Sequence, residues 1–157
     1  MLTFEQMLLR FAVALALGAL MGLERELIGK EAGIRTSMVV SGGAAIFSII
    51  GVTLPYLVSI SQQNLADTIA HNSGFLSIIA NIVVGIGFLG AGIILKTSEH
   101  VHGLTTAAVV WAAAAVGTLA GVGLLEFSFA STLIISGSLY ILRKIGVTER
   151  LRPDNIS

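Results

Sequence analysis

The sequence predicts an all-α polytopic membrane protein with five transmembrane helices, and three observations lead to this fold class. Charged residues make up 11% of the 157 residues, whereas a soluble domain has about 25%. The mean hydropathy is +0.92. Long uncharged intervals, such as Thr36 to Ala66 and Gly103 to Leu125, exceed the roughly 20 apolar residues that a helix needs to cross a bilayer.

The first two helices are predicted over residues 4–23 and 37–58. The first ends at the charged sequence GLERE, so it lacks the small-residue cleavage site of a signal peptide. The second carries Pro55 near its end, where a proline kinks a helix or marks its exit. The chain from Ser59 to Ser73 is too polar to span a bilayer and is expected to form a loop.

The last three helices are predicted over residues 75–95, 105–120 and 124–142. Only the small residues around Gly121–Gly123 separate the fourth helix from the fifth, so these two helices should form a tight hairpin. Together the five spans make up a transmembrane domain over residues 1–142. A short cytoplasmic tail at residues 143–157 follows it.

The basic residues determine the predicted orientation. Eight of the nine fall on one side of a five-helix arrangement, in the first loop, the third loop and the tail, and Arg10 is the exception. Because basic residues collect on the cytoplasmic side of a membrane, we expect the N-terminus outside and the C-terminus in the cytoplasm. An even number of helices would spoil this partition.

An internal repeat relates the first and second helices to the third and fourth. When Gly33–Gly51 is placed over Gly103–Gly121, seven of the 19 positions are identical. Both units would cross the membrane inward and then outward. The sequence therefore predicts a parallel repeat, related by an axis along the membrane normal.

Glycines at helical spacing predict close helix packing, because small residues let backbones approach each other within a bilayer. The density of glycine in the third helix places that helix at the centre of the bundle. The same glycines are also compatible with the seam of a homo-oligomer, or with a broken helix that exposes carbonyls to an ion. The packing glycines are Gly18, Gly22, Gly85, Gly87, Gly90, Gly92, Gly117 and Gly121.

Charged residues are concentrated in the first cytoplasmic loop, which holds six of the 18 charges. Glu24 directly follows the first apolar run, at a depth where an acid is costly and usually faces a partner or water. Glu24 and Glu26 are therefore candidate cation ligands or proton carriers. The alternative is a solvated helical extension, in which Glu26 pairs with Lys30 at the favoured spacing.

Two Gly-x-x-Thr sequences open the second and fourth helices, ending at Thr36 and Thr106. Threonine is a good helix N-cap, and a helix N-terminus can hold an anion. Simple capping and a small polar site between the repeats are the two interpretations. Asn81, within the third helix, is expected to be buried and to cross-link helices.

The sequence predicts no catalytic site. It has no cysteine, and no nucleophile–base pair, phosphate-binding loop or paired catalytic acids stand out. His100 and His102 have no recognised metal-binding spacing, so solvated loop histidines are favoured over a metal site. We therefore expect no enzymatic activity, no cofactor, no bound metal and no nucleic-acid partner.

The chain resembles the MgtC/SapB family of bacterial inner-membrane proteins. It does so through the motifs GLERE, KEAGIRT, SGGAAIFSIIG, GIGFLGAGIILK and GLTTAAVVW, in this order, over about residues 4–142. The resemblance implies a location in the bacterial inner membrane. It also marks the family's polar motif positions, which here are Glu24, Arg25, Glu26, Arg35, Thr36, Lys96, Thr105 and Thr106.

The resemblance further implies a role in adaptation to low magnesium, without magnesium transport by the protein itself. Some members act in the intracellular survival of pathogens and restrain the proton-translocating ATP synthase, which is therefore a candidate partner. The best-studied members carry a C-terminal cytoplasmic domain of ACT-like fold. Because this sequence ends at Ser157, we expect a short member without that domain, or a truncated chain.

These observations lead to two functional hypotheses. The first is a non-enzymatic regulatory membrane protein that packs through its glycine faces against a second copy, most simply as a dimer, or against a membrane partner. The alternative is a small transporter or channel for a cation or proton, with Glu24 and Asn81 along its path.

Overall fold

Five helices form a bundle in the computed structural model, which describes residues 1–58, 74–97 and 100–145. Two two-residue strands, β1 (Leu95–Lys96) and β2 (Val101–His102), pair in an antiparallel hairpin. The described chain is therefore all-α, as predicted, apart from this hairpin. The helices are α1 (Phe4–Leu27), α2 (Ile34–Val58), α4 (Gly74–Ile93), α5 (Leu104–Val122) and α6 (Leu125–Lys144).

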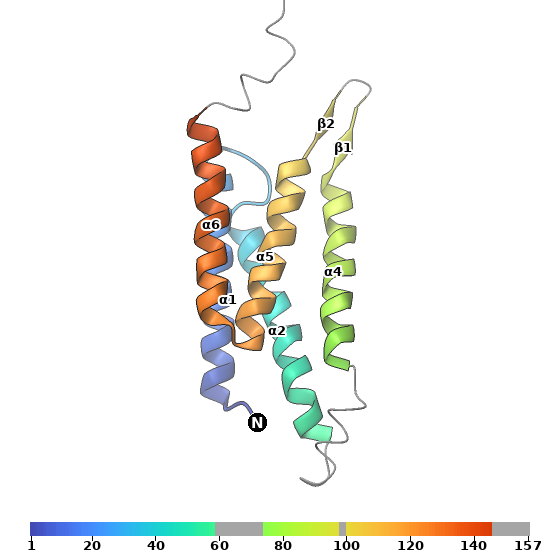
Figure 1. Cartoon of the computed structure of the whole chain (residues 1–157). Helices are drawn as coiled ribbons and strands as arrows, with labels where there is room; N and C mark the ends of the chain where they lie inside the picture. The colour runs from blue at the N-terminus through green and yellow to red at the C-terminus, as the bar shows by residue number, and fades with distance from the viewer. Residues whose placement is uncertain (59–73, 98–99, 146–157) are drawn as a thin grey trace, which may run out of the picture.

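The helices alternate in direction, so that α1, α4 and α6 end where α2 and α5 begin (Figure 1). Among the described residues, α1, α2, α5 and α6 are long and apolar enough to cross a membrane. Helix α4 adds a further apolar stretch, Ser77–Ile93, among the residues whose side chains the structure describes. The loop predicted at Ser59–Ser73 and the part of the tail beyond Ile145 lie outside the described residues.

The first helix begins at a capping box and continues past its predicted end. The Thr3 hydroxyl accepts a hydrogen bond from the Gln6 N–H, and the Gln6 side chain accepts one from the Thr3 N–H. This arrangement satisfies donors that a helix N-terminus otherwise leaves unpaired. The helix runs past Leu23 to Leu27, so Glu24 and Arg25 project from a helix and not from a loop.

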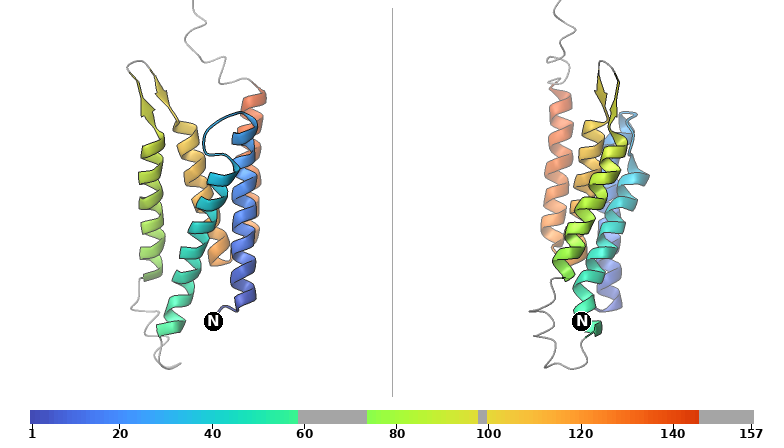
Figure 2. Two further views of the ribbon diagram at one scale, coloured as in Figure 1. Left: turned by 180° about the vertical axis from the view of Figure 1, so that it is seen from behind. Right: turned by 90° about the vertical axis from the view of Figure 1, so that its right-hand side faces the viewer.

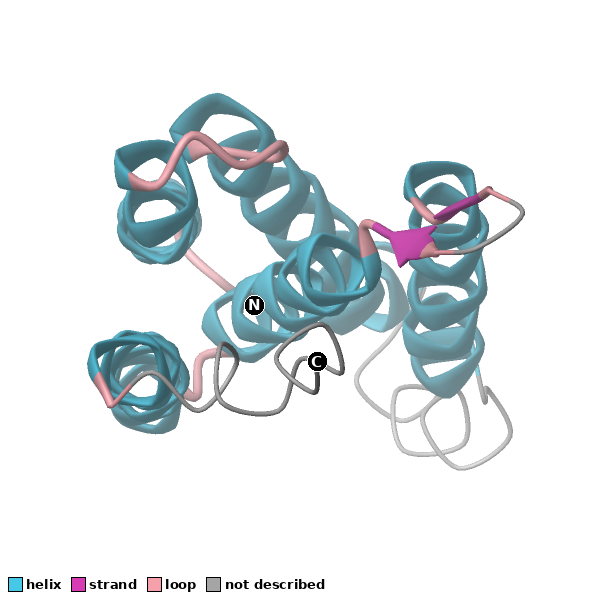
Figure 3. Cartoon of the chain, turned by 90° about the horizontal axis from the view of Figure 1, so that it is seen from above, coloured by secondary structure: helices cyan, strands magenta, loops and turns pink. Residues whose placement is uncertain are grey.

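The centre of the bundle is formed by α2 and α5, so the prediction of a central third helix, α4, is wrong. Along a stretch long enough to cross a membrane, 56% of the residues of α5 are buried, whereas 11% of those of α6 are buried. Figure 2 and Figure 3 show α4 at one edge of the bundle and α6 on the opposite side. Small residues let helices approach in either place, so glycine density alone does not identify the central helix.

Four of the predicted packing glycines bring α2 close to α1 and α5. A Cβ atom at Gly18 would lie 2.6 Å from the Cβ of Ser41, and one at Gly117 would overlap the Ser41 carbonyl. Gly22 and Gly121 likewise face the backbone of α2 or of the loop before it. These positions have no room for a side chain, so the close helix contacts depend on glycine.

The glycines of α4 do not pack in this way. A Cβ atom at Gly85, Gly87 or Gly92 would meet nothing within 4 Å among the described residues. At Gly90 it would lie 3.7 Å from the Cβ of Ala107 on α5. Thus α4 touches the bundle along one side and leaves most of its glycines bare.

Serine hydroxyls connect neighbouring helices inside the bundle. Ser41 Oγ of α2 donates to the Ala14 carbonyl of α1 at 2.7 Å, and Ser128 Oγ of α6 donates to the Val116 carbonyl of α5 at 2.9 Å. Both serines are fully buried. A hydroxyl in an apolar interior needs a partner, and these two find it on the next helix.

Arg10 lies toward the end of the bundle where the chain begins. Its Nη1 atom donates to the Gly121 carbonyl at 3.0 Å. Gly121 belongs to the last turn of α5, where carbonyls are unpaired and the helix dipole favours a cation. The one basic residue outside the predicted cytoplasmic side therefore binds the C-terminal end of a central helix.

Candidate functional site

The polar end of the bundle, where α1, α4 and α6 end, contains a buried arginine. Arg25, in the last turn of α1, is only 6% exposed. Its Nη2 atom donates to the Thr106 hydroxyl in the first turn of α5 at 3.2 Å. This bond joins residues 81 positions apart, so it connects α1, in the first predicted repeat unit, to α5, in the second.

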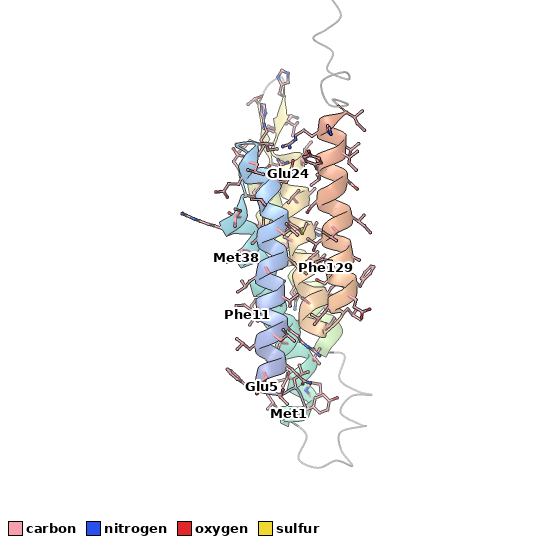
Figure 4. The ribbon with its side chains drawn as sticks, turned by 90° about the vertical axis from the view of Figure 1, so that its left-hand side faces the viewer. Met1, Glu5, Phe11, Glu24, Met38 and Phe129 are labelled. Atoms are coloured by element: carbon pink, nitrogen blue, oxygen red, sulfur yellow. The ribbon has the colours of Figure 1, made fainter. Side chains whose placement is uncertain are left out.

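Glu24 lies between two arginines. Its Oε2 atom is 3.6 Å from Arg25 Nη1, and its Oε1 atom is 3.7 Å from Arg143 Nη1 of α6. Figure 4 shows Glu24 near this end of α1, beside α6. The guanidinium of Arg143 also lies 5.5 Å from the centre of the Tyr140 ring, within the range of a cation–π contact.

The cluster of Glu24, Arg25 and Arg143 is incompletely paired. Among the described residues, Glu24 Oε2 and Arg25 Nε are buried and have no hydrogen-bond partner. At 3.6 Å the Glu24–Arg25 contact is a charge–charge attraction longer than a hydrogen bond. Two arginines against one glutamate leave a formal excess of one positive charge, although the Arg143 side chain is 41% exposed.

Glu26 performs the capping that was predicted for Thr36. Its Oε2 atom accepts a hydrogen bond from the Ile34 N–H, the first residue of α2, at 2.8 Å. Gly33 packs directly against this carboxylate, which also suits the positive end of the helix dipole. Thr36 is exposed on the first turn, so the threonine-cap prediction is wrong for α2.

The threonine-cap prediction is also wrong for α5. The N-cap of this helix is Gly103, with φ 83°, and no side chain of the described residues caps it. Thr106 instead accepts the hydrogen bond from Arg25, and Thr105 is exposed beside it. The first N–H groups of α5 are therefore left without a side-chain acceptor.

A cavity of about 590 Å³ opens at this end, between the α1–α2 loop, the β1–β2 hairpin and the N-terminus of α5. Its polar lining comes from both predicted cytoplasmic loops, and its apolar lining comes mainly from the hairpin. The residues around it are Arg25, Gly29, Lys30, Glu31, Leu95, Thr97, Val101, His102, Gly103, Leu104, Thr105 and Thr106.

Three of the candidate residues meet at this cavity, and the others lie around it. Arg25, Thr105 and Thr106 line it, while Glu24 lies behind Arg25. The remaining candidates are exposed and do not line it: Glu26, Arg35, Thr36 and Lys96. The sequence did not identify four further residues of this end as members of the site: Lys30, Glu31, His102 and Arg143. In the sequence they appeared only as charged or polar residues of the predicted loops and tail.

Asn81 lies elsewhere, on α4. Its side chain is exposed on the single chain, whereas a buried amide was predicted. The reason is the peripheral position of α4, which packs against α5 and α2 through its opposite side. Glu24 instead lines a separate cavity of about 320 Å³ between α1 and α6.

Comparison with known proteins assigns the family. A model of the MgtC family matches residues 11–147, most of the chain. The chain belongs to the MgtC family. With its apolar helices, this membership makes it a multi-pass membrane protein. No solved structure matches it.

Relatives in this family come from several organisms. Protein SapB of Bacillus subtilis is 34% identical over 154 residues, covering 95% of this chain and 63% of the relative. Protein MgtC of Salmonella typhimurium is 38% identical over 137 residues, covering 87% and 52%. Protein MgtC of Brucella abortus is 38% identical over 142 residues, covering 90% and 50%. The chain thus spans between half and two thirds of these relatives.

Proposed function

We propose that this MgtC-family protein is a non-enzymatic regulator in the bacterial inner membrane, which modulates adaptation to low magnesium and membrane energetics by helix packing. The observation that carries the proposal is the bare outer side of α4. Among the described residues, nothing packs against Gly85, Gly87 or Gly92 of this peripheral helix. Close approach by a helix of another chain would use them.

The outer side of α4 has the spacing of a packing seam. Asn81, Gly85, Phe88 and Gly92 follow one another at intervals of four, three and four residues, which is the periodicity of left-handed helix pairs. Gly85 lies at the margin of this side, where it also borders a groove of about 240 Å³ against α2. Phe88 is 85% exposed. A partner helix packed on this side would bury the Phe88 ring, and the glycines of α4 would let the two backbones approach each other.

We assign a second copy of the chain as the partner on this side, making a dimer. An asparagine amide carries both donors and an acceptor, so two Asn81 side chains can pair across a two-fold axis. In a two-fold interface each residue meets the same surface of the other copy. A single asparagine in such a seam also fixes its register.

Replacing Asn81 by leucine should weaken self-association by about fivefold, because an interhelical polar contact in a membrane contributes on the order of 1 kcal/mol. Gly85→Leu should weaken it at least as much by keeping the backbones apart. Förster resonance energy transfer between labelled copies in lipid bilayers measures the change. Gly137→Leu on α6, another glycine with open space around it, should leave association unchanged. Equal effects at Gly85 and Gly137 would refute the α4 seam.

The regulatory role is tested in cells that lack the gene. The wild-type chain should restore growth in low magnesium, and Gly85→Leu at equal abundance should not. Cross-linking from α4 then asks whether ATP synthase, the partner suggested by the family resemblance, is captured in addition to the second copy. Full rescue by a variant that no longer associates would overturn the proposal.

The transport alternative gains no support from the geometry. Glu24 is held by two arginines, whereas a cation ligand needs a carboxylate free of such partners. Asn81 lies on a different helix, and it does not line the cavity that Glu24 lines. A path connecting these two residues would have to cross the packed α5.

We also propose that the N-terminus lies outside and the C-terminus in the cytoplasm, and that α1–α2 and α4–α5 form a parallel repeat. The basic residues at the end where α1 and α4 finish and α2 and α5 begin support this orientation. The chain has no cysteine, so single cysteines report each side. Leu124→Cys should react with a membrane-impermeant maleimide in intact cells, and Lys30→Cys only after permeabilisation. The reverse pattern would refute the orientation.

A further inference from the structure

We propose that the cavity between the α1–α2 loop, the hairpin and the N-terminus of α5 binds a phosphate ester. The phosphate group would lie against Arg25, Lys30 and the first turn of α5. This site is independent of the α4 seam, because neither Asn81 nor any glycine of α4 lines the cavity.

The first argument is the uncapped end of α5. Gly103 is the N-cap, and no side chain of the described residues accepts from the first turn. Free N–H groups at a helix start and the positive end of the helix dipole together favour an oxyanion. α2 differs, because Glu26 already supplies a carboxylate there.

The second argument is Arg25, a charged side chain that lines the cavity while being 6% exposed. Its Nε has no hydrogen-bond partner among the described residues. Its Nη2 atom holds the Thr106 hydroxyl, which also lines the cavity. A buried guanidinium that lines the cavity beside uncapped N–H groups is an environment that favours phosphate.

The charges of the lining agree with an anion. Arg25 and Lys30 contribute two positive charges and Glu31 one negative charge, so these three residues sum to +1. Glu24, behind Arg25, is shared between Arg25 at 3.6 Å and Arg143 at 3.7 Å. When Glu24 and Arg143 are counted with the lining, the five charged groups still carry a formal excess of one positive charge.

Size and apolar lining point to an ester and not to the bare ion. A volume of about 590 Å³ falls in the range of about 300–1,000 Å³ that small-molecule sites occupy. Leu95, Val101 and Leu104 provide apolar surface beside the positive groups. An organic body attached to the phosphate would contact them. The ester can be a soluble metabolite or the headgroup of an anionic lipid.

Two probes distinguish these sources, with the full chain purified in a maltoside detergent that carries no phosphate. Glycerol 3-phosphate is titrated by calorimetry, and short-chain phosphatidylglycerol is titrated separately. Saturable binding of either probe supports the site. Competition for one site by the other probe shows that they share it, and binding of the lipid alone assigns the headgroup. Failure of both probes to bind would overturn the proposal.

Three variants distinguish a specific binding site from general attraction of an anion to positive charge. Lys30→Gln should weaken binding about tenfold and Thr105→Val about fivefold, as expected for the loss of one charge-assisted or one neutral hydrogen bond. Arg35→Gln removes a positive charge from the start of α2 that does not line the cavity, and should change affinity less than about twofold. Equal losses in Lys30→Gln and Arg35→Gln would overturn the proposal. Because Lys30 and Thr105 are exposed, both variants should fold.

Discussion

Gly117→Ala should lower the free energy of unfolding by about 3 kcal/mol, at the upper end of the usual cost of overpacking. The added methyl group would overlap the Ser41 carbonyl of α2. That carbonyl is backbone inside a helix and cannot rotate away, so α2 and α5 would have to separate. The separation would spread, since Ser41 also donates to Ala14 of α1. Reversible unfolding in mixed detergent and dodecyl sulfate measures the loss.

Gly87→Ala is the matched control for this prediction. The chemical change is identical, but a Cβ atom at Gly87 would meet nothing within 4 Å among the described residues. Alanine favours a helix over glycine by about 1 kcal/mol, so this variant should be as stable as the wild type or slightly more stable. Equal destabilisation at both positions would contradict the arrangement of α5 against α2.

The contrast between these glycines shows what the sequence could predict. The apolar runs were sufficient for a helical membrane bundle, because crossing a bilayer requires length and low charge. Glycine spacing correctly indicated close approach at Gly18 and Gly117. It could not distinguish them from Gly85 or Gly87, because spacing does not specify which neighbour a helix side meets.

The candidate site was predictable only as a group of charges at one end. Glu24 and Arg25 stood out because charges adjoin the end of an apolar run. Their partners could not be predicted, because Thr106 and Arg143 come from helices far along the chain. The helix caps were mispredicted for the same reason, because their partners come from other helices. A carboxylate from α1 reaches the start of α2, while an arginine from α1 engages the threonine expected to cap α5.

Glu24→Ala should be the second large effect, costing about 3 kcal/mol of stability. Removing one member of a buried ion pair leaves the other charge uncompensated, which typically costs about 3–5 kcal/mol. The lower value applies here because the Glu24 side chain keeps 10% exposure and its ion-pair distances are 3.6 and 3.7 Å. The same unfolding measurement tests it. Arg143→Ala removes a side chain that is 41% exposed, and should cost less than about 1 kcal/mol.

A double variant decides whether the penalty comes from the charge left behind. In Glu24→Leu with Arg25→Met, both buried charges disappear, and apolar replacement of a whole buried pair is often neutral. Thr106 would lose its donor, but it lines the cavity at the polar end of the bundle, where its hydroxyl can hydrogen-bond to water. The double variant should therefore be more stable than Glu24→Ala. If it were less stable, the cluster would contribute through its specific geometry, and the uncompensated charge of Arg25 would not explain the loss.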